Sequence, residues 1–233
     1  QSELYQHLLR VQEDDLEAQM NTLRYFKLSH NLRVAAAEIN GTLPLMKVSD
    51  YLSNIAEVVC SAVLDLAWRQ MAQKYGEPAV AETGSRPFVI VAYGKLGSRE
   101  LGYNSDLDLI FLFEPAIGPD KTVLYRHYNR FLQRLIHILT TRTRAGQLYA
   151  IDMRLRPDGR SGIAINSMES FTSYQLHKAY PWEHQALVRA RVIIGSESLK
   201  ENFKKVRRQV LRLPRDETDL RQSVVDMRER VIE

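Results

Sequence analysis

With 233 residues, 45% of them hydrophobic and 26% charged, the chain has the composition of a globular protein long enough to bury a core. Its one cysteine, Cys60, excludes an internal disulfide framework and fits a reducing compartment. The net charge of +4 suits phosphate-bearing small molecules and does not by itself indicate DNA or RNA. No signal peptide and no run of roughly 20 apolar residues is evident, so we expect a cytoplasmic protein with no membrane and no nucleic acid among its partners.

Both ends of the chain look like cuts through something longer. The sequence begins with Gln1 instead of methionine and stops within a charged helical pattern at 226–230. We therefore expect the chain to be part of a longer protein.

Residues 49–76 are predicted to form one amphipathic helix, because apolar residues recur there at intervals of three and four. These residues are Leu52, Ile55, Ala56, Val59, Val63, Leu66, Ala67 and Met71. Ser49 suits the N-cap of this helix and Gly76 suits its stop. Cys60 lies near the apolar face, which indicates an inert packing residue.

Residues 4–39 are also rich in helix formers, with a break expected at Gly41 and Pro44. The first expected domain is therefore a helical region at 1–80.

Three segments in the middle of the chain are predicted to be strands. They are 88–93, 106–113 and 147–156. A turn-rich connector at 83–87 precedes the first strand, and Pro115 and Gly118 end the second. The turn at 157–159 closes the third. Between the second and third strands, 121–144 has the apolar spacing of a helix.

Everything after Ser167 is predicted to be helical. Pro181 suits the first turn of a helix, and Pro214 suits a break between two helices. A small mixed sheet is thus expected between two helical regions, with a sheet domain at 81–165 and a C-terminal helical region at 166–233.

Asp106 and Asp108 are the first indication of chemistry. Side chains alternate along a strand, so both carboxylates are expected on one face. Leu107, Leu109, Phe111 and Phe113 are expected on the other face, in a core. Two neighbouring carboxylates repel each other, by roughly 4 kcal/mol at 4 Å in a medium of effective dielectric 20, unless a cation lies between them. Mg²⁺ prefers such hard oxygen ligands.

The third predicted strand adds Asp152, with Arg154 and Arg156 on the same face by alternation. If this strand pairs beside 106–113, three carboxylates and two guanidinium groups converge. Such a set suits phosphoryl chemistry with two metal ions, and arginines bind phosphate oxygens in a forked geometry. The simpler alternative for Asp152 is an ion pair with one of these arginines.

The segment Gly94-Lys95-Leu96-Gly97-Ser98 follows a predicted buried strand. It is expected to offer backbone N–H groups, the Ser98 hydroxyl and Lys95 to a triphosphate. The order of its residues matches neither a Walker A loop nor a dinucleotide-binding fingerprint. Lys95 is equally compatible with a solvated turn residue.

The spacing from Gly97-Ser98 to Asp106-Leu107-Asp108 resembles that of the nucleotidyltransferase superfamily, which includes DNA polymerase β. The longer run at 93–111, together with 152–157 and 182–191, resembles the bacterial glutamine synthetase adenylyltransferase (glutamate-ammonia-ligase adenylyltransferase) family. Ser98 departs from that family, which usually has a second glycine there. The wider superfamily accepts serine.

The resemblance implies an α+β fold, with a nucleotidyltransferase-type mixed sheet, packed helices, a helical N-terminal region and a C-terminal helical bundle. Members of the family carry two related domains: one transfers AMP from ATP to a tyrosine hydroxyl of glutamine synthetase, and the other removes it with phosphate. Residues 182–187 resemble the C-terminal, adenylylating copy. Regulation by the PII signal protein is implied by the resemblance alone.

The expected site residues follow from both lines of reasoning. Asp106 and Asp108 are expected to hold Mg²⁺ with help from Asp152. The residues expected to bind the substrate ATP are Lys95, Gly97, Ser98, Arg154 and Arg156. Catalysis would rest mostly on positioning and charge neutralisation.

Other functions stay open at this point. A phosphate-dependent deadenylylase would keep the fold and reverse the reaction, and a silent nucleotide-binding module would keep the fold without turnover. A nucleotidyltransferase for RNA ends or small molecules is a third alternative. Glu183, Arg189 and Arg191, at helical spacings, fit a salt-bridge network as well as a functional role.

Overall fold

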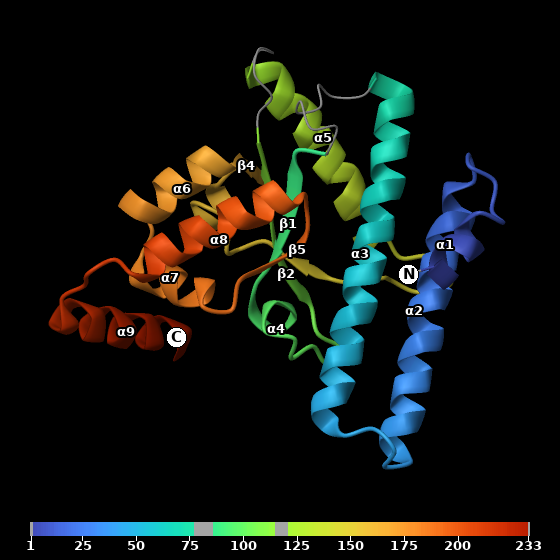
Figure 1. Cartoon of the computed structure of the whole chain (residues 1–233), viewed down its shortest axis with the longest axis horizontal. Helices are drawn as coiled ribbons and strands as arrows, with labels where there is room; N and C mark the ends of the chain where they lie inside the picture. Colours follow the sequence, from blue (N-terminus) through green and yellow to red (C-terminus); the bar gives the residue numbers. More distant parts are fainter. Residues whose placement is uncertain (1, 77–85, 115–120, 233) are drawn as a thin grey trace.

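The structure is a computed structural model that describes residues 2–76, 86–114 and 121–232. Its elements in chain order are α1 (Ser2–Leu8), α2 (Leu16–Ile39), α3 (Leu45–Tyr75), β1 (Phe88–Ala92), α4 (Gly94–Gly97), β2 (Leu107–Phe113), α5 (Lys121–Thr140), β3 (Ile151–Asp152), a 3₁₀ turn (Gly159–Ser161), β4 (Ile165–Ser167), α6 (Met168–His177), α7 (Pro181–Leu187), β5 (Arg191–Ile194), α8 (Glu197–Leu211) and α9 (Glu217–Ile232). A central sheet separates two helical layers, with α3 and α5 on one side and α6 and α8 on the other (Figure 1). The expected α+β class is confirmed.

The sheet has five strands in the order β3-β2-β1-β5, with β4 also paired to β2. β1 runs antiparallel to β2 and β5, whereas β2 runs parallel to β3 and β4. The expected mixed sheet is therefore present. The pairing on which the convergence of Asp152 with Asp108 depended is also present.

The side chains of β2 alternate between two cores. One core, shared with α3 and α5, contains Leu107, Leu109, Phe111 and Phe113, as predicted. The other core, on the side of α6 and α8, contains Ile110 and Leu112. By the same alternation Asp108 lies on the face of Ile110, at the start of the strand, where it stays partly exposed.

The prediction that everything after Ser167 is helical is wrong at β5. This strand lies between α7 and α8 and pairs with β1. Its four residues are too few for strand alternation to stand out against helical patterns on both sides. The strand β4 is a further addition to the predicted sheet, whereas the predicted strand at 147–156 shrinks to the two residues of β3.

The predicted central helix is confirmed as α3, and every residue of its expected apolar face is buried, Cys60 included. It begins at Leu45, not near Ser49, because Pro44 holds the extended backbone that precedes a helix. Its C-terminus at Gly76 agrees with the prediction, and the positive φ of 78° there explains the glycine.

The other predicted helices differ from the observed ones mainly at their ends. Residues 4–39 are divided into α1 and α2, with Asp15 accepting a hydrogen bond from the Ala18 N–H at the start of α2. The helix predicted at 121–144 ends at Thr140. Pro181 in the first turn of α7 and the break at Pro214 are as predicted. The connector at 83–85, Pro115 and Gly118 lie outside the described residues.

In the described part of the chain, α3 alone is long and apolar enough to cross a membrane by length and composition, with a mean hydropathy of 1.2 in its most apolar stretch. Of that stretch, 67% is buried inside the molecule, which is the behaviour of a core helix. The test is therefore weak support for a membrane span. The absence of a membrane partner and the domain boundaries near 80 and 165 stay predictions.

The short helix α4 is a single turn wedged against β1, β2 and β5. A Cβ atom added to Gly97 would lie 2.0 Å from the backbone oxygen of Arg189 and 2.7 Å from that of Ala92. These are backbone atoms, so they cannot swing aside as a side chain can. The missing side chain at position 97 therefore lets α4 rest directly on the segment that leads into β5.

We predict that Gly97→Ala lowers the free energy of unfolding by about 1–3 kcal/mol, the usual range for overpacking a tight site. Urea unfolding followed by circular dichroism measures this. Gly102→Ala is the matched control, because the nearest atom to its added Cβ is the Ser105 hydroxyl at 3.3 Å, which can rotate. Equal free energies for Gly97→Ala and the parent chain would show that α4 does not depend on this contact.

Candidate active site

Asp108 and Asp152 are held side by side by strand pairing. They occupy the same register position of the parallel strands β2 and β3, and neighbouring strands lie about 4.8 Å apart. The pKa of Asp108 is raised, first by burial and then by the negative charge of Asp152, with a smaller contribution from Asp106. Arg154 and Lys95 act in the opposite direction on the same pKa. The structure thus contains the crowded carboxylates that the sequence predicted.

Asp106 lies one residue before β2, not inside it as predicted. Pairing begins at Leu107, whose N–H donates to the Ala150 carbonyl at 3.0 Å. The Asp106 side chain is exposed, yet it is near enough to Asp108 to raise that pKa. Asp106 therefore lies beside the pair with its side chain open to solvent.

Gly94 explains how Asp108 fits against α4. A Cβ at this position would lie 2.3 Å from Oδ2 of Asp108, and the backbone there has a positive φ of 51°. Both observations require glycine. The carboxylate of Asp108 thus lies directly against the first residue of α4, next to Lys95, whose charge lowers the pKa of Asp108.

The Gly97–Ser98 turn has a structural role in this conformation. The Gly97 N–H donates to the Tyr93 carbonyl at 2.9 Å, and the Ser98 N–H donates to the Gly94 carbonyl at 3.1 Å. The Ser98 hydroxyl donates to that same carbonyl at 2.9 Å. These two N–H groups and the hydroxyl therefore close the turn itself. Their predicted contact with a triphosphate stays a prediction.

The carboxylate of Asp152 is bound to Arg154. It accepts hydrogen bonds from the Arg154 backbone N–H at 2.8 Å and from Nε at 2.7 Å, and Nη2 forms an ion pair at 2.5 Å. Arg156 points elsewhere: Nε donates to the Gly162 carbonyl at 3.1 Å, and Nη1 donates to the Met153 carbonyl at 3.0 Å. The shared face expected for the two arginines does not form, because the chain turns after β3.

Across the described residues, no group of three or more His, Cys, Asp or Glu side chains is arranged to hold a metal ion. For the predicted trio the reason is visible, because Asp152 faces Arg154 and Asp106 is exposed. The donor set itself fits Mg²⁺, since it consists of carboxylate oxygens, and the pKa of Asp108 is raised by burial and then by the negative charges of its two carboxylate neighbours.

The residues at 182–191 stabilise the fold around the site. Glu183 is buried and accepts hydrogen bonds from the Tyr174 hydroxyl at 3.0 Å and from the Tyr180 N–H at 2.9 Å, so it caps α7. His184 Nε2 lies 2.8 Å from the Gln175 carbonyl, and burial lowers the pKa of His184. Among the described residues Glu183 forms hydrogen bonds and no ion pair, so the salt-bridge alternative is not borne out for it.

For the two arginines the structure contains the ion pairs of the salt-bridge alternative. Arg189 pairs with Glu100 at 3.3 Å, and Arg191 pairs with Glu57 of α3 at 2.6 Å. Arg191 also donates to the Gly97 carbonyl at 3.2 Å and therefore ties α4 to both α3 and β5. Its predicted helical position is wrong, because it is the first residue of β5. Because β5 was not predicted, the spacing of residues along the chain could not predict this contact.

Comparison with known proteins gives the family. The model of the glutamate-ammonia ligase adenylyltransferase family matches residues 1–206. Proteins named "Bifunctional glutamine synthetase adenylyltransferase/adenylyl-removing enzyme" are 51% identical in Pseudomonas syringae pv. tomato over 97% of this chain and 48% identical in Hahella chejuensis over 98%. The chain spans 24% of the length of each of these two curated relatives. Since the family model covers most of its residues, the chain belongs to the glutamate-ammonia ligase adenylyltransferase family.

Proposed function

We propose that this chain transfers AMP from Mg²⁺-bound ATP to a tyrosine hydroxyl of glutamine synthetase and releases pyrophosphate. One observation carries the proposal: a member of an adenylyltransferase family places Asp108 and Asp152 at paired positions of neighbouring strands, with Asp106 beside them. Nucleotidyl transfer needs carboxylates in that arrangement to hold the divalent cations that neutralise phosphate charge.

Asp106 and Asp108 would hold the divalent cations, and Asp152 would complete the set. Bound Mg²⁺ supplies charge neutralisation for the triphosphate and lowers the pKa of the attacking hydroxyl. The chain itself positions the groups. Strand pairing fixes Asp108 against Asp152, and Gly94 fixes the Asp108 carboxylate against α4. Lys95, at the same end of α4, supplies positive charge for a phosphate oxygen.

Arg154 has two roles in this proposal. Without a cation it neutralises Asp152 through a forked contact, and 65% of its side chain stays exposed. If Asp152 held a cation, its contact with Arg154 would be lost, and the guanidinium group would then be free beside the site to bind phosphate. Arg156 braces the turn after β3 through two backbone carbonyls, so we now assign it a structural role.

A second candidate function is the removal of AMP from modified glutamine synthetase with phosphate. The relatives' names include an adenylyl-removing activity, and this chain spans only 24% of the Pseudomonas syringae relative. The likeness of 182–187 to the adenylylating copy supports the transfer direction. Regulation by the PII protein and a cytoplasmic location stay predictions from the family.

We predict that Asp106→Asn and Asp108→Asn each reduce AMP transfer by more than about 100-fold, because each removes a cation ligand. The measurement follows α-labelled ATP into unmodified glutamine synthetase and locates the modified residue by mass spectrometry. Asp158→Asn is the matched control, an exposed aspartate on the turn after β3. Near-normal transfer by either site variant would exclude this site. Label lost from pre-modified enzyme only with phosphate would assign the reverse activity.

We predict that Asp108→Asn raises the melting temperature of the chain when no divalent cation is present. The folded-state pKa of Asp108 lies above its ordinary value, so ionisation at neutral pH costs the folded state stability. The gain should shrink as the pH falls toward about 3.9, where the unfolded carboxyl is also protonated. Mg²⁺ should raise the melting temperature of the parent chain and not that of the variant. Equal Mg²⁺ shifts in both would contradict the assignment.

We predict that Arg154→Ala tightens Mg²⁺ binding in the absence of nucleotide, because Asp152 then loses the cation that competes for it. An increase of about 2–10-fold in Mg²⁺ affinity is expected, the size of effect that follows when one nearby positive charge is removed. Isothermal titration calorimetry measures it. Arg156→Ala, by contrast, should lower the melting temperature and leave Mg²⁺ affinity unchanged, since this side chain contacts backbone carbonyls. Tighter Mg²⁺ binding by Arg156→Ala, with a lower melting temperature and unchanged Mg²⁺ affinity for Arg154→Ala, would contradict both assignments.

A further inference from the structure

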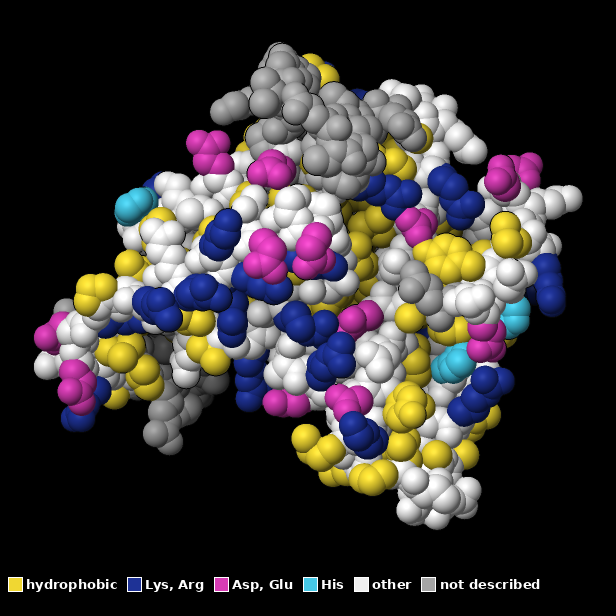
Figure 2. Space-filling view, viewed as in Figure 1, with side chains coloured by type: hydrophobic (Ala, Val, Ile, Leu, Met, Phe, Trp, Pro, Cys, Tyr) yellow, Lys and Arg dark blue, Asp and Glu magenta, His cyan; other side chains and the backbone are white. Residues whose placement is uncertain are grey.

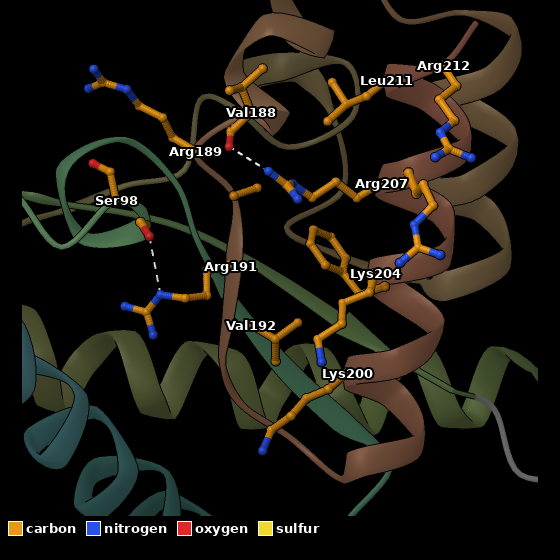
Figure 3. Close-up of a pocket in the computed structure, with 14 residues that line it drawn as sticks. Ser98, Val188, Arg189, Arg191, Val192, Lys200, Lys204, Arg207, Leu211 and Arg212 are labelled. Atoms are coloured by element: carbon orange, nitrogen blue, oxygen red, sulfur yellow. Dashed lines mark hydrogen bonds between the residues drawn. The ribbon is translucent and has the colours of Figure 1, made fainter.

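A basic groove lies beside α4, at the end of α4 that carries Gly97 and Ser98. Its volume is about 610 Å³, and we call it the α8 groove because one face of α8 forms one wall and the segment 188–192 forms the other. Gly97 and Ser98 lie at one edge. Figure 3 shows Lys200, Lys204, Arg207 and Arg212 along α8, opposite Val188 and Val192.

Arginine side chains of two kinds line this groove. Arg207 and Arg191 belong to its walls: Arg207 donates to the Leu187 carbonyl at 2.7 Å and to the Val188 carbonyl at 2.6 Å, and Arg191 is bound to Glu57. Arg208 and Arg212 are exposed, and across the described residues neither side chain forms a hydrogen bond or an ion pair, although Arg208 lies near enough to Glu201 to contribute to its lowered pKa. These two arginines are therefore available to a ligand.

Lys200 and Lys204 are only weakly engaged. They pair with Glu197 at 3.3 Å and with Glu201 at 2.6 Å, each within one turn of the same helix. Exposed pairs of this type are easily exchanged for a better partner. Even with these two glutamates present, basic residues are in excess, and Lys and Arg side chains gather over α8 on the face shown in Figure 2.

The spacing of the cations fits an extended chain. Lys200, Lys204, Arg208 and Arg212 recur at every fourth residue, which places them about 6 Å apart and spreads them over about 18 Å. Alternate side chains of an extended peptide are about 7 Å apart, close to the same interval. Four cations in such a row span more length than the phosphates of one nucleotide need. Val188, which is 56% exposed, and partly buried Leu211 add apolar surface to the groove.

The groove is connected to the candidate active site through α4. Gly94 at one end of this turn lies against Asp108, and Gly97 at the other end lies against the Arg189 backbone, which lines the groove. Only one helical turn, about 5 Å of rise, separates the two contacts. A segment bound in the groove would therefore end close to the carboxylates.

We propose that the α8 groove binds an extended acidic segment of the protein that accepts AMP and holds it while the acceptor tyrosine lies at the carboxylates. The inference rests on the proposed function and names how its protein substrate is recognised. Acidic side chains contact Lys200, Lys204, Arg208 and Arg212, and apolar side chains of the segment pack on Val188 and Leu211. The binding rests on several exposed charged contacts that salt screens, so affinity should fall steeply with salt.

The test compares Arg208→Glu/Arg212→Glu with Arg33→Glu/Arg221→Glu. Both double variants change the net charge equally, and the control residues are exposed on α2 and α9, outside the groove. Two quantities are measured with unmodified glutamine synthetase: steady-state AMP transfer, and binding to the immobilised enzyme at low and high NaCl. The groove variant should raise the KM for glutamine synthetase by about tenfold or more, and it should weaken binding and its salt dependence. The kcat and the KM for ATP should be unchanged, and the control should resemble the parent chain.

Other outcomes overturn the inference in distinguishable ways. Normal transfer and normal binding by the groove variant would exclude the groove and leave the proposed function intact. A raised KM for ATP would assign the groove to the nucleotide. Equal loss in both double variants would indicate a general charge effect. If the parent chain neither binds nor modifies glutamine synthetase, the proposed function fails, and the inference fails with it. Groove-dependent binding without transfer would support the docking surface and contradict the proposed reaction.

Discussion

The structure depends on one electrostatic constraint, the enforced proximity of Asp108 and Asp152. Strand pairing fixes their backbones, and the core beneath Leu107 and Leu109 prevents the strands from separating. Two carboxylates at about 4 Å repel each other by roughly 4 kcal/mol at an effective dielectric of 20. In the present conformation Arg154 and Lys95 reduce that repulsion. A cation that binds between carboxylates held together in this way relieves their repulsion and therefore binds more favourably. That role explains why a stable fold keeps the carboxylate pair.

The turn α4 connects this pair to the rest of the molecule. It has two glycines for two different close contacts, Gly94 against the Asp108 carboxylate and Gly97 against the Arg189 backbone. Arg191 then ties the same turn to α3 through Glu57. The N-terminal helices, the sheet and the segment before α8 thus meet at one helical turn. A ligand that moves α4 would therefore shift the contacts of α4 at the carboxylates and at the α8 groove together.

Periodicity predicted those parts of the fold that bury many residues. The apolar face of α3 and the alternation of β2 are strong signals because each involves a whole element. The sequence identified Asp108 and Asp152 as candidates, but only the structure shows that their strands pair, because spacing along the chain does not determine which strands are neighbours. The strand β5 was missed because four residues carry too little pattern. The partner of Asp152 was left open, since only the turn after β3 decides that Arg154 reaches it and Arg156 does not.

The most direct measurement is the location of a divalent cation in crystals of this chain soaked with Mn²⁺ and a non-hydrolysable ATP analogue. Anomalous scattering identifies the metal without reference to activity. We expect a peak within ligand distance, about 2.2 Å, of carboxylate oxygens of Asp106 and Asp108, with Asp152 turned away from Arg154. A fully bound nucleotide with no metal at these carboxylates, or with Asp152 still paired to Arg154, would contradict the central role of this site.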